Sequence, residues 1–442
     1  MSVADRIIQR VSADYVVRPP TGAITVLFFA IVTVLLAFPL LFVPDQIHLT
    51  APPTYSFVHD GAWTIQHPAK GSEYIDHLGA MAAIDGGVDR LLAGNGQIII
   101  LSDYTIPPTY IIAGMVTTLA LPVSTILFHN LYFVVSMFLA GVFTFFFVRA
   151  VLDERAVALL AGVLYMSSFY LFNAYVMGHT NQWQIQWIPL ILFSVERMRV
   201  HAEAGFVGKS VVLLAVAFGI QVLSSMQYSA YLSFVLPLYV FLRLLYGATG
   251  FRSALFWKGF GTATLLAAIA TSPYLYARFR LIQAGTTSQT TLQADSYVWY
   301  QVQNVIGEFF AADAQLQFIF RLLLVVGGVL TLYTVSRQRF RQLAPFAFLF
   351  GICVLIAWGP FSPWAPYALF HTYWPLVGYF RVPYRILPFA LLGSSTLAAS
   401  VLFHLPERES GWLGLRRVVL LVITAIQVAL VHSTLMFYEY LG

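Results

Sequence analysis

The sequence predicts an all-α polytopic membrane protein of about eleven transmembrane helices, forming a single domain over residues 1–442. Three observations predict this fold class. The chain is 59% hydrophobic and only 10% charged, whereas roughly a quarter of the residues in a soluble domain are charged. Apolar runs of about 20 residues, enough to cross a bilayer, recur along the chain. Helices satisfy their backbone polar groups internally, so these runs are interpreted as helices rather than barrel strands.

The composition excludes several classes of protein and site. A single cysteine, Cys353, excludes an intrachain disulfide framework and a cysteine-rich metal site. The net charge of +5 does not indicate a nucleic-acid partner, because the Lys and Arg residues follow membrane topology. The sequence has no Walker loop, HExxH, GxSxG or Cys/His metal spacing, so no metal site is predicted and this chain alone handles no nucleotide. The sequence leaves open whether a divalent cation serves as a cofactor.

The first element is predicted to be a retained transmembrane helix. Residues 23–43 are uncharged, and their length exceeds the roughly 7–15 residues of a signal-peptide core. In chain order the spans are predicted at about 22–43, 112–149, 156–176, 185–198, 210–226, 229–247, 259–277, 319–335, 343–358, 386–404 and 414–436. The second range is too long for one crossing, and Pro122 is expected to precede a spanning helix at about 124–149.

The distribution of Lys and Arg orients these helices. With residues 1–21 in the cytoplasm, seventeen of the twenty-four Lys and Arg residues fall on the cytoplasmic side. Polar and aromatic clusters outside the helices gather on the extracytoplasmic side. They comprise the first external loop, 44–109, the further external loops 278–318 and 359–385, and the shorter segments 178–186 and 224–228. The function is therefore expected on the outer face.

The first external loop holds seven of the nineteen acidic residues. If about 72–92 form an interfacial helix, Glu73, Asp76 and His77 share one edge of it. A carboxylate partly desolvated at the membrane surface can act as a base on an incoming hydroxyl. The alternative is a solvated amphipathic helix whose acids face water. Asp103 is equally typical of a turn before the paired prolines that follow it.

A second cluster, GHTNQWQIQW, lies between two apolar runs. His179 can position a phosphate or a sugar hydroxyl, and the glutamines, Gln182 among them, offer amide donors and acceptors. Trp183 and Trp187 have the alternative interpretation of residues in the aromatic belt at the membrane interface. The cluster is a candidate for substrate binding.

A third cluster, YFRVPYR, carries Arg381 and Arg385, two of only seven cationic residues on the outer side. Planar guanidinium groups suit phosphate oxygens and form strong charge-assisted hydrogen bonds with them. Pro383 prevents a regular helix across the pair. The alternative is a pair of snorkelling arginines at a helix start. Arg278, where the longest later external loop opens, is a second candidate for phosphate binding.

In order and spacing, these motifs resemble the GT-C class of integral-membrane glycosyltransferases, and within it a broad prokaryotic group. The motifs are Asp76 with DRLLAGN (Asp89 to Asn95), LPVSTILFHN (Leu121 to Asn130), GHTNQWQIQWIPL (Gly178 to Leu190) and WGP with FRVPYR. The resemblance covers about residues 70–405. Two features depart from it: Ile75 stands where a glycine is expected, and the soluble domain that follows the last helix in many relatives is missing.

The resemblance implies an enzyme of a prokaryotic cytoplasmic membrane, with its active site on the extracytoplasmic face. Such an enzyme transfers a sugar from a polyprenyl-phosphate donor to a glycan, lipid or protein acceptor. GT-C enzymes carry their base in the first external loop, which implies Asp76, with Glu73 and Asp103 as alternatives. Phosphate-contacting residues in later external loops imply Arg381 and Arg385.

The expected reaction is an inverting transfer. Asp76 removes a proton from the acceptor hydroxyl, while Arg381 and Arg385 hold the departing polyprenyl phosphate and His179 assists. The rival hypothesis is a non-catalytic subunit of an envelope assembly, with a membrane-protein partner, or a lipid or glycan transporter such as a flippase. Ion-coupled transport is disfavoured because the mid-span regions hold almost no ionisable groups.

Overall fold

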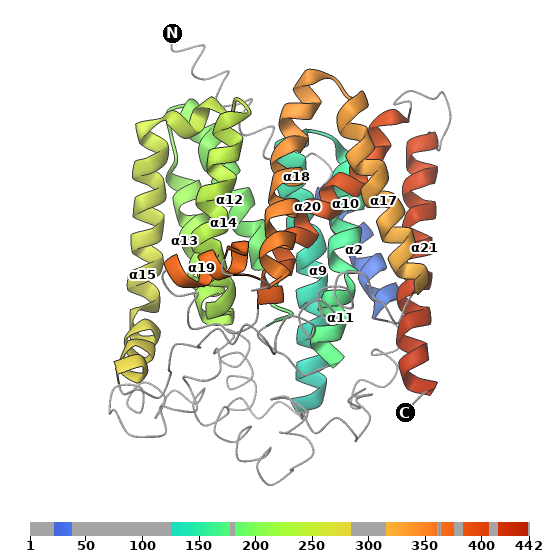
Figure 1. Cartoon of the computed structure of the whole chain (residues 1–442), viewed down its shortest axis with the longest axis horizontal. Helices are drawn as coiled ribbons and strands as arrows, with labels where there is room; N and C mark the ends of the chain where they lie inside the picture. Colours follow the sequence, from blue (N-terminus) through green and yellow to red (C-terminus); the bar gives the residue numbers. More distant parts are fainter. Residues whose placement is uncertain are drawn as a thin grey trace.

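A computed structural model describes residues 22–37, 125–176, 182–283, 315–359, 362, 364–374, 383–405 and 414–440, and in these residues the chain is helical with no strands (Figure 1). The α-helices are α2 (Gly22–Leu36), α9 (Thr125–Leu152), α10 (Arg155–Met166), α11 (Phe169–Val176), α12 (Trp187–Glu203), α13 (Gly208–Ser224), α14 (Met226–Leu245), α15 (Ala254–Gln283), α17 (Gln315–Thr334), α18 (Arg337–Ala357), α19 (Pro366–Tyr373), α20 (Leu387–Ala399) and α21 (Leu415–Tyr440). The 3-10 turns are η1 (Thr249–Arg252), η3 (Pro383–Ile386) and η4 (Ser400–His404). The all-α prediction is confirmed for these residues.

Within the described part of the chain, seven helical stretches are long and apolar enough to cross a membrane. They are Leu131–Leu152, Arg155–Phe172, Met226–Leu245, Ala254–Tyr276, Arg337–Ala357, Pro383–His404 and Leu415–His432. Shorter apolar helices are Gly22–Leu36, Gly208–Ser224 and Ile319–Thr334. This is the helical character of a polytopic membrane protein. Each predicted range overlaps a helix, whereas the count of eleven spans stays a prediction.

Successive long helices run in opposite directions, so their connections alternate between two ends of the bundle (Figure 1). The end at which α9, α12, α14 and α17 finish is termed the basic end. In or near it lie Arg149, Arg155, Arg197, Arg199, Lys209, Arg243, Arg252, Lys258, Arg337, Arg339, Arg341, Arg416 and Arg417. The other end, where α12, α14 and α17 begin, is termed the opposite end. Basic residues thus gather in alternate connections, as the sequence predicts, while the side of the membrane that each end faces stays a prediction.

Glycine closes helices at the basic end. Gly205 follows α12 with φ 85°, in the left-handed region that a residue without Cβ adopts at least cost. The amide of Phe206 then donates to the carbonyl oxygen of His201 at 2.9 Å. Gly247, with φ 97°, ends α14 in the same way. These tight ends turn the chain back into the bundle over a few residues.

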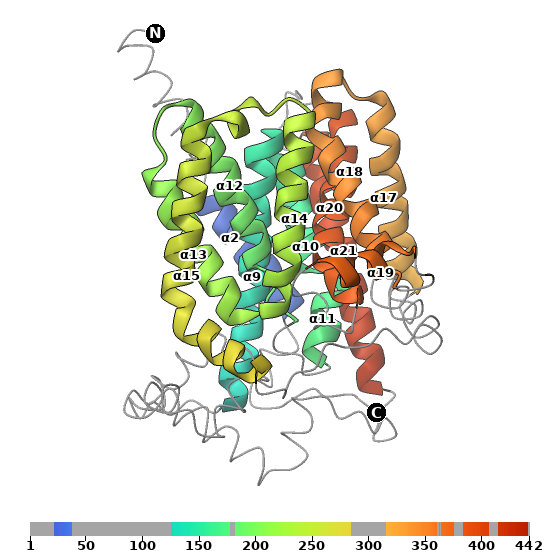
Figure 2. The ribbon, with the colours of Figure 1, turned by 60° about the vertical axis from the view of Figure 1, so that its left-hand side comes forward.

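The centre of the bundle is formed by α9 and α10, which pack closely on each other. A Cβ atom on Gly162 would lie 2.6 Å from the carbonyl oxygen of Gly141, so only glycine allows this approach. Small residues bring transmembrane helices together in this way. The ring of Phe29 of α2 packs directly against both glycines. Turning the bundle shows α13 and α15 at one flank and α17 at the other (Figures 1 and 2).

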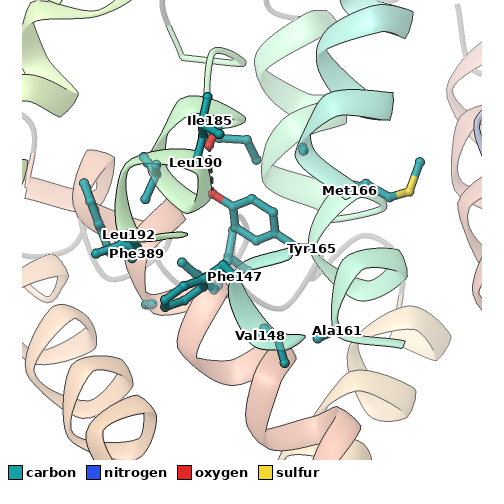
Figure 3. Close-up of a cluster of buried hydrophobic side chains, with 14 of the residues drawn as sticks. Phe147, Val148, Ala161, Tyr165, Met166, Ile185, Leu190, Leu192 and Phe389 are labelled. Atoms are coloured by element: carbon teal, nitrogen blue, oxygen red, sulfur yellow. Dashed lines mark hydrogen bonds between the residues drawn. The ribbon is translucent and has the colours of Figure 1, made fainter. Parts of the chain in front are cut away.

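The segment that precedes α12 is tied to this centre by Tyr165 of α10. The phenol is fully buried, and its hydroxyl donates to the carbonyl oxygen of Ile185 at 3.2 Å (Figure 3). Phe147 and Phe389, from α9 and α20, surround it in the same cluster. A buried phenol needs a hydrogen-bond partner, so this contact fixes residues 182–186 on the bundle.

In three places the type of structure, and not only the bounds of a helix, differs from the prediction. The helix predicted over 156–176 is interrupted after Met166, giving α10 and α11. α15 runs on to Gln283, so Arg278 lies in a helix and not at the start of a loop; no helix breaker follows Pro273 before Gly285. The range 359–385, predicted as a loop, contains α19 and η3. Pro at the start of α19 is compatible with the first helical turn.

Candidate functional site: a guanidinium held by two glutamines

Of the eight predicted site residues, the structure brings Gln182 and Arg385 together. Glu73, Asp76, Asp103, His179 and Arg381 lie outside the described residues. The backbone of Arg278 lies near the end of α15, and its side chain is outside the described part. The site is therefore built around Arg385.

Arg385 lies in the η3 turn, which Pro383 begins directly before α20. Its Nη1 donates to Oε1 of Gln227 at 2.8 Å. With its amide oxygen facing the guanidinium, Gln182 accepts from Nε and Nη2, each at 3.2 Å. The two glutamines thus use three of the five N–H donors of a guanidinium. Arg385 is positioned by the protein, unlike a snorkelling side chain, and two N–H groups can still bind an anion.

The first turn of α14 adds to the positive potential beside Arg385. Ser225 caps this helix, its side chain accepting from the backbone amide of Tyr228 at 3.4 Å. The first turn contains Gln227 and has no acidic residue. A helix N-terminus carries a partial positive charge and favours anions. The guanidinium group of Arg385 and the N-terminus of α14 therefore both favour the binding of an anion.

Gln182 is held in place by tyrosines and by its neighbour Trp183. The hydroxyl of Tyr228 donates to the backbone oxygen of Gln182 at 2.6 Å, and it lies 2.8 Å from the hydroxyl of Tyr170. Trp183 is fully buried and stacks on Tyr175, with ring centroids 5.4 Å apart. Trp183 anchors the segment inside the bundle, so its interpretation as a residue of the interfacial belt is wrong.

The other two glutamines of this segment bind α9. The hydroxyl of Tyr132 donates to Oε1 of Gln184. Nε2 of Gln186 donates to Oγ of Ser136 at 3.2 Å and to Oε1 of Gln184 at 3.3 Å. Gln184 and Gln186 therefore hold the segment to the bundle, while Gln182 faces the arginine.

Two buried tyrosines complete the surroundings of Arg385. Tyr231 of α14 and Tyr367 of α19 both interact electrostatically with Arg385. Burial raises the pKa of Tyr367 far above its ordinary value, so this phenol stays neutral. Phe370 of α19 stacks on Tyr231, with centroids 6.1 Å apart, and this contact helps to hold α19 against α14. Together with Gln182 and Gln227, these residues are termed the Arg385 cluster.

The cluster is suited to binding an anion and lacks a group that would take up a proton. In the described ranges no carboxylate pairs with Arg385. Those ranges also contain no group of three or more His, Cys, Asp or Glu side chains that could hold a metal ion. The proton acceptor of a transfer reaction would have to come from another part of the chain.

The sequence patterns do not indicate Gln227, Tyr231 or Tyr367 as site residues. The only sequence signal near them is the polar segment 224–228, which separates two apolar runs and is predicted to lie on the extracytoplasmic side. Its pairing with YFRVPYR depends on the fold. Comparison with protein-family models, curated proteins and solved structures finds no match to this chain. The geometry of the Arg385 cluster therefore carries the functional proposal.

Proposed function

We propose that this protein is a glycosyltransferase of a prokaryotic cytoplasmic membrane. It moves a sugar from a polyprenyl-phosphate donor to a glycan, lipid or protein acceptor on the extracytoplasmic side. The observation that carries this proposal is Arg385, held by Gln182 and Gln227 with donors to spare, at the end of the bundle away from the basic end. A phosphate on a lipid carrier is the anion that such a site in a membrane protein would meet.

In the proposed reaction Asp76 takes the proton of the acceptor hydroxyl, and the acceptor oxygen attacks the anomeric carbon of the donor sugar. The bond from that carbon to the phosphate oxygen breaks, and its electron pair stays on the polyprenyl phosphate. Arg385 and Arg381 stabilise the added negative charge. Preorganised donors aimed at developing charge are an effective source of catalysis because they need no rearrangement during the reaction.

The polyprenyl tail of the proposed donor would lie in the same membrane as the apolar helices of the protein. Each CH₂ group of a buried lipid chain contributes about 0.8 kcal/mol to membrane binding, so the polyprenyl tail keeps the donor in the bilayer. The phosphate then reaches the protein at the membrane surface. Arg385 lies just before α20, within the span Pro383–His404 and close to its start, which is a suitable level for such a contact.

The test is the glycan composition of a deletion strain that carries variants of the gene. Asp76→Asn and Arg385→Ala are expected to lose the sugar that the wild-type gene restores, measured by mass spectrometry of lipid-linked and envelope glycans. Arg337→Ala is the matched control, because Arg337 is exposed at the basic end. Native glycans in both site variants would refute the transferase proposal.

Binding of polyprenyl phosphate to the purified chain separates the transferase from its rival. A transferase with Asp76→Asn is expected to bind this lipid and transfer nothing. If Asp76→Asn leaves the glycans intact while Arg385→Ala abolishes both binding and glycans, the chain is a non-catalytic carrier-binding subunit or a flippase. Asp76→Asn is therefore expected to abolish the glycans if the chain is a transferase, and to leave them intact if it is a non-catalytic subunit or a flippase.

A further inference from the structure

A second group of arginines lies at the basic end, where α9 passes into α10 beside the start of α21. The connection between α9 and α10 has only two residues, Asp153 and Glu154, and Asp153 turns the chain with φ 52°. Aspartate is one of the few residues that visit this left-handed conformation. The tight turn brings Arg149, in the last turn of α9, close to Arg155, the first residue of α10.

The two carboxylates of this turn pair with other arginines. Asp153 forms an ion pair with Arg149, with Oδ1 3.1 Å from Nη2. Oε2 of Glu154 lies 3.3 Å from Nη1 of Arg416, and this ion pair joins the start of α10 to the first turn of α21. Neither carboxylate forms an ion pair with Arg155.

Arg155 has no compensating charge in the described residues. Its Nε is buried and has no hydrogen-bond partner there, and none of their carboxylates pairs with it or with the exposed Arg417. Arg417 and Arg149 both repel the guanidinium of Arg155. Like charges held close together raise the free energy of the folded protein. A ligand that carries a negative charge would offset this repulsion.

The start of α10 adds to the positive potential at this point. Glu154 is the N-cap residue of α10 but makes no capping hydrogen bond with its side chain, and the first turn has no acidic residue. The first N–H groups of a helix have no partner within it, and with the helix dipole they favour an anion. Arg155, Arg417 and the N-terminus of α10 therefore all favour anion binding.

This group of charges lies at the level of the lipid headgroups. One apolar span, Leu131–Leu152, ends directly before the turn, and the next begins at Arg155. The 22 residues of the first span rise about 33 Å at about 1.5 Å each, which matches a hydrocarbon core about 30 Å thick. Leu421, one turn after Arg417 on the same face of α21, is exposed. An anion that binds here from the membrane would have its apolar tail beside Leu421.

We propose that Arg155 and Arg417 bind the phosphate group of an anionic glycerophospholipid at the basic end of the bundle. The phosphate accepts from both guanidinium groups beside the N-terminus of α10, and an acyl chain lies along α21 at Leu421. The bound lipid joins α10 to α21, in addition to the ion pair of Glu154 with Arg416. This site lies at the end of the bundle away from the Arg385 cluster, so it does not depend on the proposed transferase activity.

The test is native mass spectrometry of the full chain in detergent, titrated with phosphatidylglycerol, with phosphatidylcholine of the same acyl chains, or with inorganic phosphate. Wild type is expected to bind phosphatidylglycerol at least about tenfold more tightly than phosphatidylcholine. Arg155→Gln and Arg417→Glu are each expected to lose this preference, since the second places a carboxylate beside Arg155. The control is Arg252→Gln, which removes an exposed charge from η1 at the same end and is expected to keep the preference.

Arg417 is exposed, so Arg417→Glu decides the outcome if Arg155→Gln does not fold. Equal affinity of wild type for the two lipids would overturn the proposal, because the arginines would then be neutralised within the chain. An unchanged preference in Arg417→Glu, or its loss in Arg252→Gln, would show that these two arginines do not form the site. Inorganic phosphate that binds as tightly as phosphatidylglycerol would also overturn the proposal, because the site would then belong to a free anion.

Discussion

Arg385 donates to Gln227 Oε1 at 2.8 Å although the two residues are 158 positions apart. One lies in the turn before α20 and the other in the first turn of α14. The hydrogen bond therefore depends on the mutual placement of two distant helices. It also leaves the guanidinium without a neutralising carboxylate in the described ranges, because glutamine offers an amide oxygen where glutamate would offer a full negative charge.

Gln227→Glu is predicted to leave the fold intact and to remove anion binding. Glutamate is close to glutamine in shape, so its carboxylate would form an ion pair with Arg385 at the present distance. Such a pair neutralises the guanidinium and repels a phosphate. Affinity for polyprenyl phosphate is expected to fall at least about tenfold, measured by native mass spectrometry, while the melting temperature stays at or above that of wild type.

The matched control is Gln227→Leu, which removes the acceptor without adding charge. Loss of a hydrogen bond to a charged group costs about 1.5–3 kcal/mol, so this variant is expected to be less stable than wild type. Equal anion affinity in wild type and Gln227→Glu would show that Arg385 does not bind the ligand.

The helices of this protein were predictable from sequence, because their apolar runs report a local property of the chain. The start of α9 at Thr125 agrees with the predicted span at about 124–149. The contact of Gln182 with Arg385 was not predictable, although both were chosen as candidates. Periodicity and composition contain no information on which helix ends meet, and the choice of Gln182 over Gln184 depends on the turn that Trp183 anchors.

Gly328→Ala is predicted to destabilise the packing of α17 on α20. A Cβ atom at this position would lie 2.1 Å from the carbonyl oxygen of Leu397, so the two backbones would have to separate. Overpacking of this kind costs about 1–3 kcal/mol. The measurement is the melting temperature of the purified protein in detergent.

Gly351→Ala in α18 is the control for this substitution, because a Cβ atom there meets nothing within 4 Å. In a helix interior alanine is more stable than glycine by about 0.5–1 kcal/mol, and this gain is expected at Gly351 because the added methyl group meets no other atom. A melting temperature that responds equally to both substitutions would contradict the close approach of α17 and α20.

His371 is predicted to make the stability of the protein depend on pH. Desolvation by burial lowers the pKa of this imidazole in α19 below its ordinary value of 6.5, so the folded state favours the neutral ring. Its contribution to stability is complete above the unfolded pKa and is lost as the pH falls through the lower folded pKa. The melting temperature of wild type is expected to fall more steeply below about pH 6.5 than that of His371→Gln. Parallel curves for the two proteins would exclude this role.

Glu196 is predicted to be the most sensitive single position on the basic side of the bundle. Its fully buried carboxylate accepts from Nε of Arg243 at 2.7 Å, from Nε of Arg199 at 2.8 Å and from the hydroxyl of Tyr239 at 2.6 Å. Glu196→Leu leaves the buried Arg243 uncompensated, which costs about 3–5 kcal/mol.

Two further variants distinguish the cost of an unpaired charge from a general intolerance of change at this position. Adding Arg243→Met to Glu196→Leu removes the orphaned charge, and replacement of a buried ion pair by apolar residues of similar volume is often neutral. The double variant is therefore expected to recover most of the lost stability in thermal unfolding. Glu203→Gln is the control at a side chain 43% exposed, where an ion pair contributes at most about 1 kcal/mol. A double variant as unstable as Glu196→Leu would show that packing, and not charge, sets the cost.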